Sequence, residues 1–384
     1  MITSFLFVSC DSDNDDNVIE VTAPATYEFL RDGVSTVSFS GQTTRLNQVD
    51  AIYNALNSKA DDGSGAQKFY TEAQIDAMFA DGAGFMDAAL NGTGKKVRSK
   101  TSAGCAAGNS ATQAQFDDQI ADFTANVVSA WSADASAGVA GKITYTSNPS
   151  KSIHVNKFGH EIDQTFVKGL IGGMCLDQIV NNYLQPCQLD SGTRRDDNTN
   201  GTLSSGKNYT DMEHKWDEAF GYLYGQEADY SRADLGSAPT GNGTTLNKYF
   251  KKINDSNMPG ISQIVYDAFK LGRAAIVAGN YEVRDAQANI IKLNLSKVIG
   301  YKSVDYLNGY MSKMAGGDTG DAFHALSEGY GFIMSLQFTN DGNDNPYFTK
   351  AEVDAMLAKM SDFWTVKDSD LTSMVSQIKS KMNI

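Results

Sequence analysis

Apolar residues recur every three or four positions along most of the chain after Thr44, which is the spacing of amphipathic helices. In TRLNQVDAIYNALNSK, residues 44–59, Leu46, Val49, Ile52 and Leu56 would share one helical face. The same periodicity predicts helices at 71–82, 111–134, 164–184, 211–225, 246–254, 260–279, 284–295, 302–314, 320–337, 350–363 and 368–382. The segment 164–184 is apolar around most of its circumference, so we expect a central helix there.

The segments outside these helices have a different composition. Residues 18 to about 45 are rich in Val, Thr and aromatic residues and are broken by Pro and Gly, which predicts a short extended arm. Polar, Gly-rich stretches at 192–208, 236–245 and 340–346 predict surface loops. The sequence therefore indicates an all-α domain over 27–384, with subdomain edges near 190–210 and near 340.

The net charge of the chain limits the classes of partner that it can bind. The chain has 32 Lys and Arg against 46 Asp and Glu, a formal net charge of −14. An acidic surface repels nucleic acids and anionic lipid headgroups, so we expect no nucleic-acid partner. The 384 residues contain only four histidines, which makes each of them conspicuous.

The N-terminus resembles the end of a lipoprotein signal peptide. The apolar run Ile2–Val8 closes on Ser9 and Cys10, which predicts a signal peptide at 1–9, truncated at its basic end, and lipidation of Cys10. An ordinary thiol is the alternative. Residues 10–26 form an acidic tether similar to the surface-export signal of some outer-membrane lipoproteins. We therefore expect a protein held in outer-membrane lipid by Cys10, at the cell surface or otherwise on the periplasmic face.

The remaining cysteines leave two interpretations open. With Cys10 lipidated, Cys105, Cys175 and Cys187 are an odd number. Cys175 and Cys187 could form a disulfide, or they could remain free thiols.

Polar residues cluster where the central helix is expected to begin. In KFGHEIDQTFVKGLIGGM, residues 157–174, His160, Glu161 and Gln164 have helical spacing and would converge on one edge, while Gly159 allows close approach of a ligand. His160 and Glu161 are ligand types for Zn²⁺ or iron. The competing interpretation is a buried polar network that ties helices together.

Two further pairs could complete a site. His214 with Glu218 and His324 with Glu328 are each four residues apart. Sites in helical bundles are often assembled from facing helices, so His160, Glu161, His214 and His324 could meet.

A calcium loop is disfavoured at the third polar stretch. Asp341, Asn343, Asn345 and Glu352 match positions of an EF-hand loop, but Pro346 replaces its required Gly. Thr349 and Glu352 instead predict a helix capping box, as do Thr71 and Gln74.

Several segments carry a family resemblance. GHEIDQ (159–164) is similar to the Gly-x-His-x-x-Glu motif of the imelysin-like proteins, exported helical proteins linked to iron uptake and nominally classed as metallopeptidases. Glu161 stands in the place of the His, and Gln164 in that of the Glu. A lipoprotein branch of this superfamily, which carries a domain of unknown function, resembles YEFLRDGVSTVSFSGQTTRL (27–46), MEHKWDEAFGYLYG (212–225), FKLGRAAIVAGNY (269–281), HALSEGYGFIMSLQF (324–338) and YFTKAEVDAMLAKMSDFW (347–364).

The resemblance implies two packed helical bundles. Together with the residues above it indicates a non-catalytic cell-envelope lipoprotein that binds a ligand, iron or another divalent metal among the candidates, in nutrient uptake. A metal-dependent peptidase and a surface adhesion or assembly module are the alternatives. The expected ligand-binding residues are Gly159, His160, Glu161, Gln164, His214, Glu218, His324 and Glu328, with Glu161 and His160 as metal ligands.

Overall fold

The computed structural model describes residues 20–61, 67–106 and 108–384. Within these ranges the chain forms 13 α-helices, several short π- and 3₁₀-helical turns, and three two-stranded antiparallel sheets. The predicted all-α fold is confirmed. Cys10 and most of the tether 10–26 lie outside the described residues.

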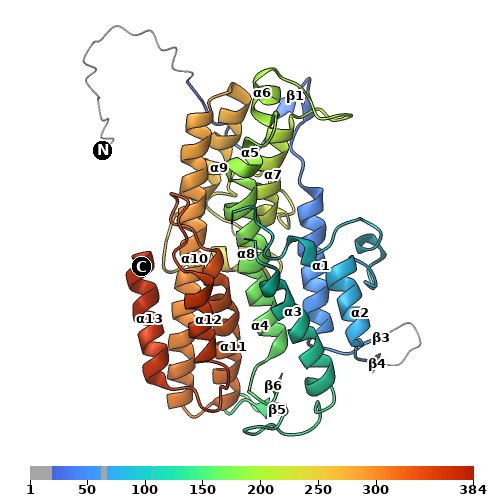
Figure 1. The fold of residues 1–384 in the computed structure, drawn as a ribbon, viewed down its shortest axis with the longest axis vertical. Coiled ribbons are helices and arrows are strands. Elements are labelled where there is room, and N and C mark those ends of the chain that lie inside the picture. The colour runs from blue at the N-terminus through green and yellow to red at the C-terminus, as the bar shows by residue number, and fades with distance from the viewer. Residues whose placement is uncertain (1–19, 62–66, 107) are drawn as a thin grey trace.

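One long helix organises the others. Helix α10 (Tyr281–Ala315) runs along the molecule; α9 (Ile261–Ala278) packs beside its first half, and α11 (Thr319–Ser335) and α13 (Asp368–Met382) beside its second half (Figure 1). The sequence had predicted two helices here, 284–295 and 302–314, and that division is wrong. Gly300 sits in the gap between them, and a Cβ added there would lie 2.5 Å from Met382 Sδ. Gly300 therefore permits close packing of α13 without interrupting the helix.

The predicted central helix is present. Helix α4 (Ile162–Leu170) continues through π-helical turns η5 (Ile171–Leu176) and η6 (Ile179–Tyr183), and every residue from 161 to 185 is buried. The segment is apolar over most of its circumference, and the charged side chains that it buries, such as Lys168 and Asp177, have partners within the fold. Helix α11 crosses α4 at small residues. A Cβ on Gly172 would clash with Ser335, and one on Gly331 with Lys168.

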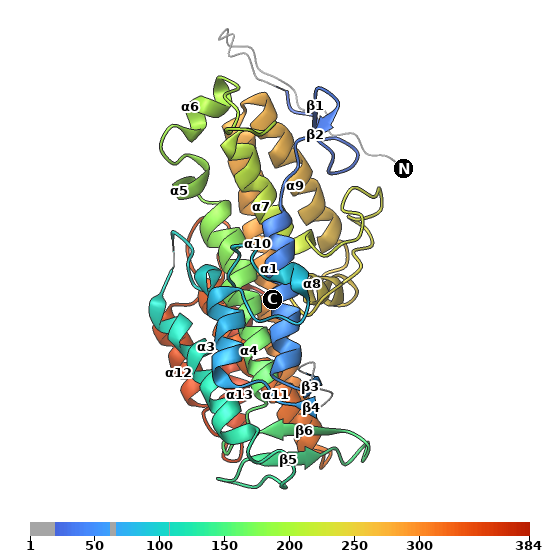
Figure 2. The same ribbon diagram turned by 90° about the vertical axis from the view of Figure 1, so that its right-hand side faces the viewer.

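The other elements surround this core, as Figures 1 and 2 show. The helices are α1 (Ser40–Ala55), α2 (Glu72–Asp76), α3 (Ser110–Asp122), α5 (Pro186–Leu189), α6 (Arg194–Thr199), α7 (Asp211–Tyr224), α8 (Leu246–Asn254) and α12 (Lys350–Ala358). The strands are β1 (Leu30–Arg31), β2 (Val34–Ser35), β3 (Ala60–Asp61), β4 (Gln67–Lys68), β5 (Gly141–Thr144) and β6 (Ser152–Val155). The short turns are η1 (Ala77–Asp81), η2 (Ala88–Leu90), η3 (Arg98–Lys100), η4 (Phe123–Val127) and η7 (Leu336–Phe338). Hairpins β1–β2 and β5–β6 lie at opposite ends of the molecule.

The predicted extended arm precedes α1 and is held by a buried ionic network. Arg273 on α9 is fully buried and donates to Glu213 Oε1 at 3.0 Å, Asp217 Oδ1 at 3.1 Å and Thr36 Oγ1 of the arm at 3.0 Å. Tyr27 of the arm also donates to Asp217, at 2.7 Å. The arm is therefore docked by polar side chains on two helices.

Two details differ from the expectations. The disulfide joins Cys105 to Cys187, while Cys175 is a buried free thiol, so the Cys175–Cys187 pairing is wrong. The predicted loop 192–208 contains the short helix α6, which is fixed to its neighbours because Asn198 donates to Ile276 O at 2.8 Å and Arg194 contacts Asp211.

Candidate functional site

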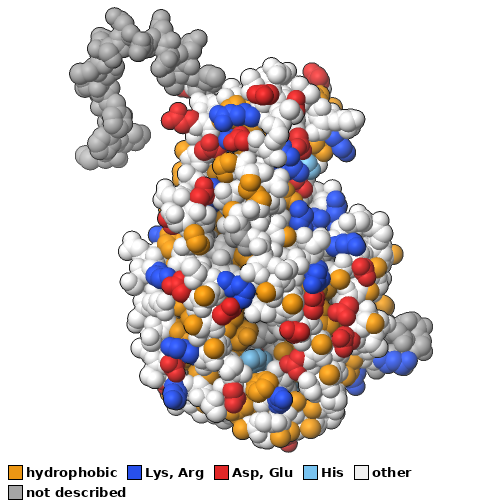
Figure 3. Space-filling model, viewed as in Figure 1, with side chains coloured by type: hydrophobic (Ala, Val, Ile, Leu, Met, Phe, Trp, Pro, Cys, Tyr) orange, Lys and Arg blue, Asp and Glu red, His pale blue; other side chains and the backbone are white. Residues whose placement is uncertain are grey.

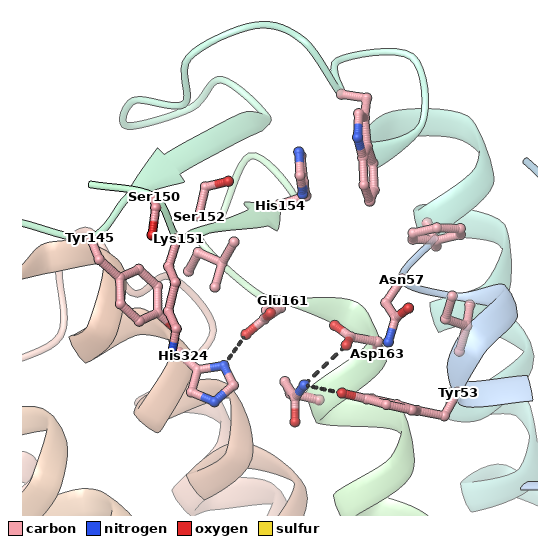
Figure 4. A pocket seen from close by; sticks show the side chains of 15 residues that line it. Tyr53, Asn57, Tyr145, Ser150, Lys151, Ser152, His154, Glu161, Asp163 and His324 are labelled. Atoms are coloured by element: carbon pink, nitrogen blue, oxygen red, sulfur yellow. Dashed lines mark hydrogen bonds and ion pairs between the residues drawn. The ribbon is translucent and has the colours of Figure 1, made fainter. Parts of the chain in front are cut away.

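A cavity of about 430 Å³ opens at the β5–β6 end of the molecule. Its walls come from the end of α1, the beginning of α4, the first turns of α11 and the β5–β6 hairpin. The lining side chains are Tyr53, Leu56, Asn57, Phe123, Trp131, Tyr145, Ser150, Lys151, Ser152, Ile153, His154, Glu161, Asp163, Gln164 and His324 (Figure 4). The sequence had singled out Glu161, Gln164 and His324 among these.

The turn before α4 brings Glu161 to the N-terminal end of that helix. Asn156 Oδ1 accepts the backbone N–H groups of Phe158 and His160, at 2.9 and 3.0 Å, and closes the turn. Gly159 there has φ +87°, and a Cβ on it would lie 2.6 Å from the ring of Phe323. This backbone conformation and close approach require Gly. The structure thus gives Gly159 a role in the fold rather than beside a ligand.

Glu161 and His324 form the closest ionic contact in the cavity. His324 Nδ1 lies 2.6 Å from Glu161 Oε2 (Figure 4). Its Nε2 lies 3.7 Å from Glu328 Oε2. Burial alone would lower the pKa of His324, but the hydrogen bond and the negative charge of Glu161 outweigh burial and raise that pKa. The raised pKa favours the imidazolium form, which has a carboxylate near each ring nitrogen.

A second layer lies beneath this pair. Glu328 Oε1 accepts a hydrogen bond from Tyr249 at 3.0 Å and lies 3.5 Å from Lys168 Nζ. Burial would raise the pKa of Glu328, yet the charges of Lys168 and His324 make it lower than usual. Lys168 is itself buried, and its ammonium lies 5.6 Å from the ring centroid of Tyr53. Negative and positive charges thus alternate from Glu161 at the cavity through His324 and Glu328 to Lys168 beneath it.

Asp163 is the second acidic group of the cavity and is 5% exposed. Gln164 Nε2 bridges Asp163 Oδ2 at 3.0 Å and the hydroxyl of Tyr53 at 3.1 Å (Figure 4). Burial and the neighbouring charge of Glu161 raise the pKa of Asp163 well above its usual range. The same burial, with Asp163 nearby, raises the pKa of Tyr53 to about 12. Asp163 is therefore a carboxyl group that favours its neutral form.

His160 does not join this cluster. Its Nε2 lies 3.1 Å from the backbone oxygen of Met360, and its ring packs against Tyr330 and Phe363. Burial lowers its pKa to about 4, so the imidazole is neutral. The expected convergence of His160, Glu161 and Gln164 thus holds for the last two alone. Helical spacing does not apply to His160 because α4 begins at Ile162, and His160 belongs to the preceding turn.

His214 and Glu218 lie on α7, in the other half of the molecule, and do not line the cavity. Glu218 is engaged by Lys215 at 2.9 Å and by Gln42 at 3.0 Å, while the ring of His214 stacks on Tyr209. The four-residue combination of His160, Glu161, His214 and His324 therefore does not assemble. Of that set, the structure brings together Glu161 and His324.

The side chains present do not fit a bound metal ion. Among residues 20–61, 67–106 and 108–384, no group of three His, Cys, Asp or Glu side chains is arranged to hold one. Glu161 and Glu328 lie at opposite nitrogens of His324, so the three cannot converge on one ion. In the EF-hand-like stretch, Asp341 accepts N–H groups of its own turn, and Glu352 caps α12 and pairs with Lys381.

The cavity also contains residues that the sequence did not single out. Asp163 was adjacent to the chosen positions, but its burial could not be seen in the residue spacing. Lys151 and His154 come from the β5–β6 hairpin, which the sequence analysis did not predict. The ring of His154 stacks on Trp131 at 3.5 Å, and burial lowers the pKa of His154 to about 4. The alternation of Ile153 and Val155 with polar residues was the available signal for a strand.

The face of the molecule that Figure 3 shows has mixed charge. Figure 3 shows acidic and basic side chains interspersed over one face of the molecule. Among the described residues, no helix is both long and apolar enough to cross a membrane.

Fold and site together define a mainly helical protein with a polar cavity at the start of its central helix. The chain belongs to the family described as "Domain of unknown function (DUF4856)", whose model matches residues 24–384. No curated protein and no solved structure matches the chain.

Proposed function

We propose that this protein is a non-catalytic binding protein of the cell envelope that holds a small organic molecule in the cavity between α1, α4, α11 and the β5–β6 hairpin. One observation carries the proposal. Side chains from five separate segments, many of them charged or aromatic, face a space of about 430 Å³, which lies in the range of small-molecule sites. A purely structural polar network looks different: the guanidinium of Arg273, for example, is buried and hydrogen-bonded to Asp217 and Glu213, and it does not line this cavity.

The chemistry of the cavity favours binding over hydrolysis. A metallopeptidase needs an ion that activates water, and the side chains in the part of the chain that the structure describes do not fit one. His324 has a carboxylate at both ring nitrogens, so neither nitrogen is free to take a proton from a nucleophile. Uptake of a metal through Glu161 and His160 is disfavoured for the same reason, since the two side chains point into different surroundings.

Blocking the cavity tests the proposal. Ser152 lines the cavity from β6, so Ser152→Trp should fill it while leaving the acidic groups in place. We expect the natural full chain to show a rise in melting temperature with at least one compound of a library covering amines, amino acids, sugars, carboxylates and phosphates. Ser152→Trp should lose that rise.

The matched control is Ser373→Trp on the exposed face of α13, which should respond as the natural chain does. A library in which no compound acts on the natural chain would contradict the proposal. Equal responses of the natural chain and Ser152→Trp would place binding elsewhere.

The envelope location is part of the proposal and rests on the sequence around Cys10. We infer lipidation of Cys10, anchoring in the outer membrane and the relation to imelysin-like proteins. The all-helical arrangement in two tiers along α10 supports that relation. Metabolic labelling with a radioactive fatty acid should mark the natural chain in its host and leave Cys10→Ser unmarked. Equal labelling of both, or of neither, would refute the anchor.

A further inference from the structure

We propose that the bound molecule carries a primary ammonium group, which binds between the carboxylates of Glu161 and Asp163 while its hydrocarbon part lies against the aromatic walls. This inference rests on the proposed function, because it names the ligand class of that same cavity.

The charge balance of the cavity carries the first step. Glu161 is 8% exposed and Asp163 5% exposed, and both belong to the first residues of the α4 segment. The nearest imidazolium, His324, already pairs with Glu161. Lys168, the next cation, contacts Glu328. Asp163 is thus left with neutral hydrogen-bond donors, and a buried carboxylate is stable in its charged form only when it is paired. A ligand cation would supply that partner.

The second step is a comparison with an ammonium group that the fold already buries. Lys168 Nζ lies 3.5 Å from Glu328 and within 5.6 and 5.5 Å of the ring centroids of Tyr53 and Tyr249. A carboxylate with aromatic rings is therefore an environment that stabilises a cation in this bundle. Tyr53 also lines the cavity, and Glu161, Asp163, Trp131 and Tyr145 offer the same two kinds of group to a ligand.

Competing ligand classes are less well matched. A metal ion would need ligands that converge, and these do not. An anion in the cavity would be repelled by the carboxylate of Glu161. Lys151 would do little to offset this repulsion, because it is exposed on the hairpin while Glu161 and Asp163 are buried. A neutral polyol could use the hydroxyl and amide groups but carries no charge with which to stabilise Asp163 as a carboxylate. The test therefore compares a cationic, a neutral and an anionic ligand of similar shape.

The probes are benzylamine, benzyl alcohol and benzoate, measured by isothermal titration calorimetry on the full chain. We expect benzylamine to bind, and benzyl alcohol to bind about 10- to 100-fold more weakly, the size of a charge-assisted hydrogen bond. Benzoate should bind more weakly still. Tighter binding of benzyl alcohol or benzoate than of benzylamine would overturn the ammonium assignment but leave cavity binding intact. Binding of none of the three would overturn the assignment and count against the cavity as a site for small organic molecules.

Two substitutions in the cavity, with one control outside it, test what each charge contributes to binding. Asp163→Asn keeps the shape of the side chain and removes the carboxylate. It should therefore weaken the binding of benzylamine by about 10- to 100-fold and leave the binding of benzyl alcohol unchanged. Asp196→Asn on α6, an exposed acid at the other end, should have no effect. Lys151→Ala removes a cation, so the affinity for benzylamine should stay the same or increase. Loss of benzylamine binding in Lys151→Ala, or its persistence in Asp163→Asn, would contradict the assignment.

The pH dependence gives an independent readout. The charged or titratable groups that face Asp163 are Glu161, Lys168, His324 and Tyr53. With the pKa of Asp163 raised by burial and by Glu161, the free protein holds a proton there that an ammonium ligand must displace. Affinity for benzylamine should therefore increase from about pH 6 to about pH 8.5, and Asp163→Asn should remove most of the increase. An affinity that falls over this range would refute the displacement.

Discussion

Replacing Arg273 with Met is expected to lower the free energy of unfolding by about 3–5 kcal/mol, the largest stability loss that we predict for a single side chain in this protein. Arg273 is fully buried and is the common partner of Glu213, Asp217 and Thr36. Met would fill much of the volume but would leave the buried carboxylate of Asp217 without its cation and Glu213 with Arg31 alone. Urea unfolding followed by circular dichroism measures the change.

The pH response distinguishes lost charge pairing from lost packing. Burial raises the pKa of Asp217 to about 6 even with Arg273 present, and removal of the guanidinium should raise it further. The folded variant then takes up protons that the unfolded chain does not, so its deficit should shrink as the pH is lowered from about 7 to about 5. Arg195→Met, whose side chain is 53% exposed, is the control and should cost less than about 0.5 kcal/mol. A deficit for Arg273→Met that does not depend on pH would contradict the charge argument.

Replacing Gly331 with Ala should both destabilise the protein and weaken ligand binding. A Cβ at Gly331 would clash with Lys168 Cβ and lie 2.7 Å from the backbone nitrogen of Gly169. Backbone cannot rotate away as a side chain can, so α11 must move off α4, at a cost of about 1–3 kcal/mol or more. The same movement separates His324 on α11 from Glu161 beside α4, which now lie 2.6 Å apart. Thermal unfolding and benzylamine titration report the two effects.

Gly309→Ala is the matched control for this prediction. Gly309 lies inside α10 with no atom within 4 Å of an added Cβ, so Ala should stabilise the helix by about 0.5–1 kcal/mol. We therefore expect Gly331→Ala to lower the free energy of unfolding and Gly309→Ala to raise it. Equal stability changes at Gly331 and Gly309 would mean that the α4–α11 contact yields easily and does not fix the cavity.

Much of the fold could be predicted because its signals are local. The capping boxes of Thr71 with Gln74 and Thr349 with Glu352 are present where the sequence placed them. Side-chain oxygens and backbone N–H groups three residues apart make these contacts whatever surrounds them. The β5–β6 hairpin was missed because its strands have four residues each and sit between polar loops.

The candidate site could be predicted only in part. Glu161 and Gln164 were found because they open the central helix, and His324 because histidines are rare in this chain. Their neighbours could not be found in this way. Whether a polar side chain meets a partner depends on which helices cross and where, and residue spacing along one helix carries no such information.

The sequence by itself determined the helical class, the buried central segment, the extended arm and the net charge of −14. Each of these follows from local periodicity, capping or composition. The tertiary structure alone decided that Glu161 meets His324 while His160 turns to Met360, that Cys105 and not Cys175 pairs with Cys187, and that Asp163 is buried beside a cavity. These are contacts between residues that are distant in the chain or surroundings built by several elements. They depend on packing that no single segment contains.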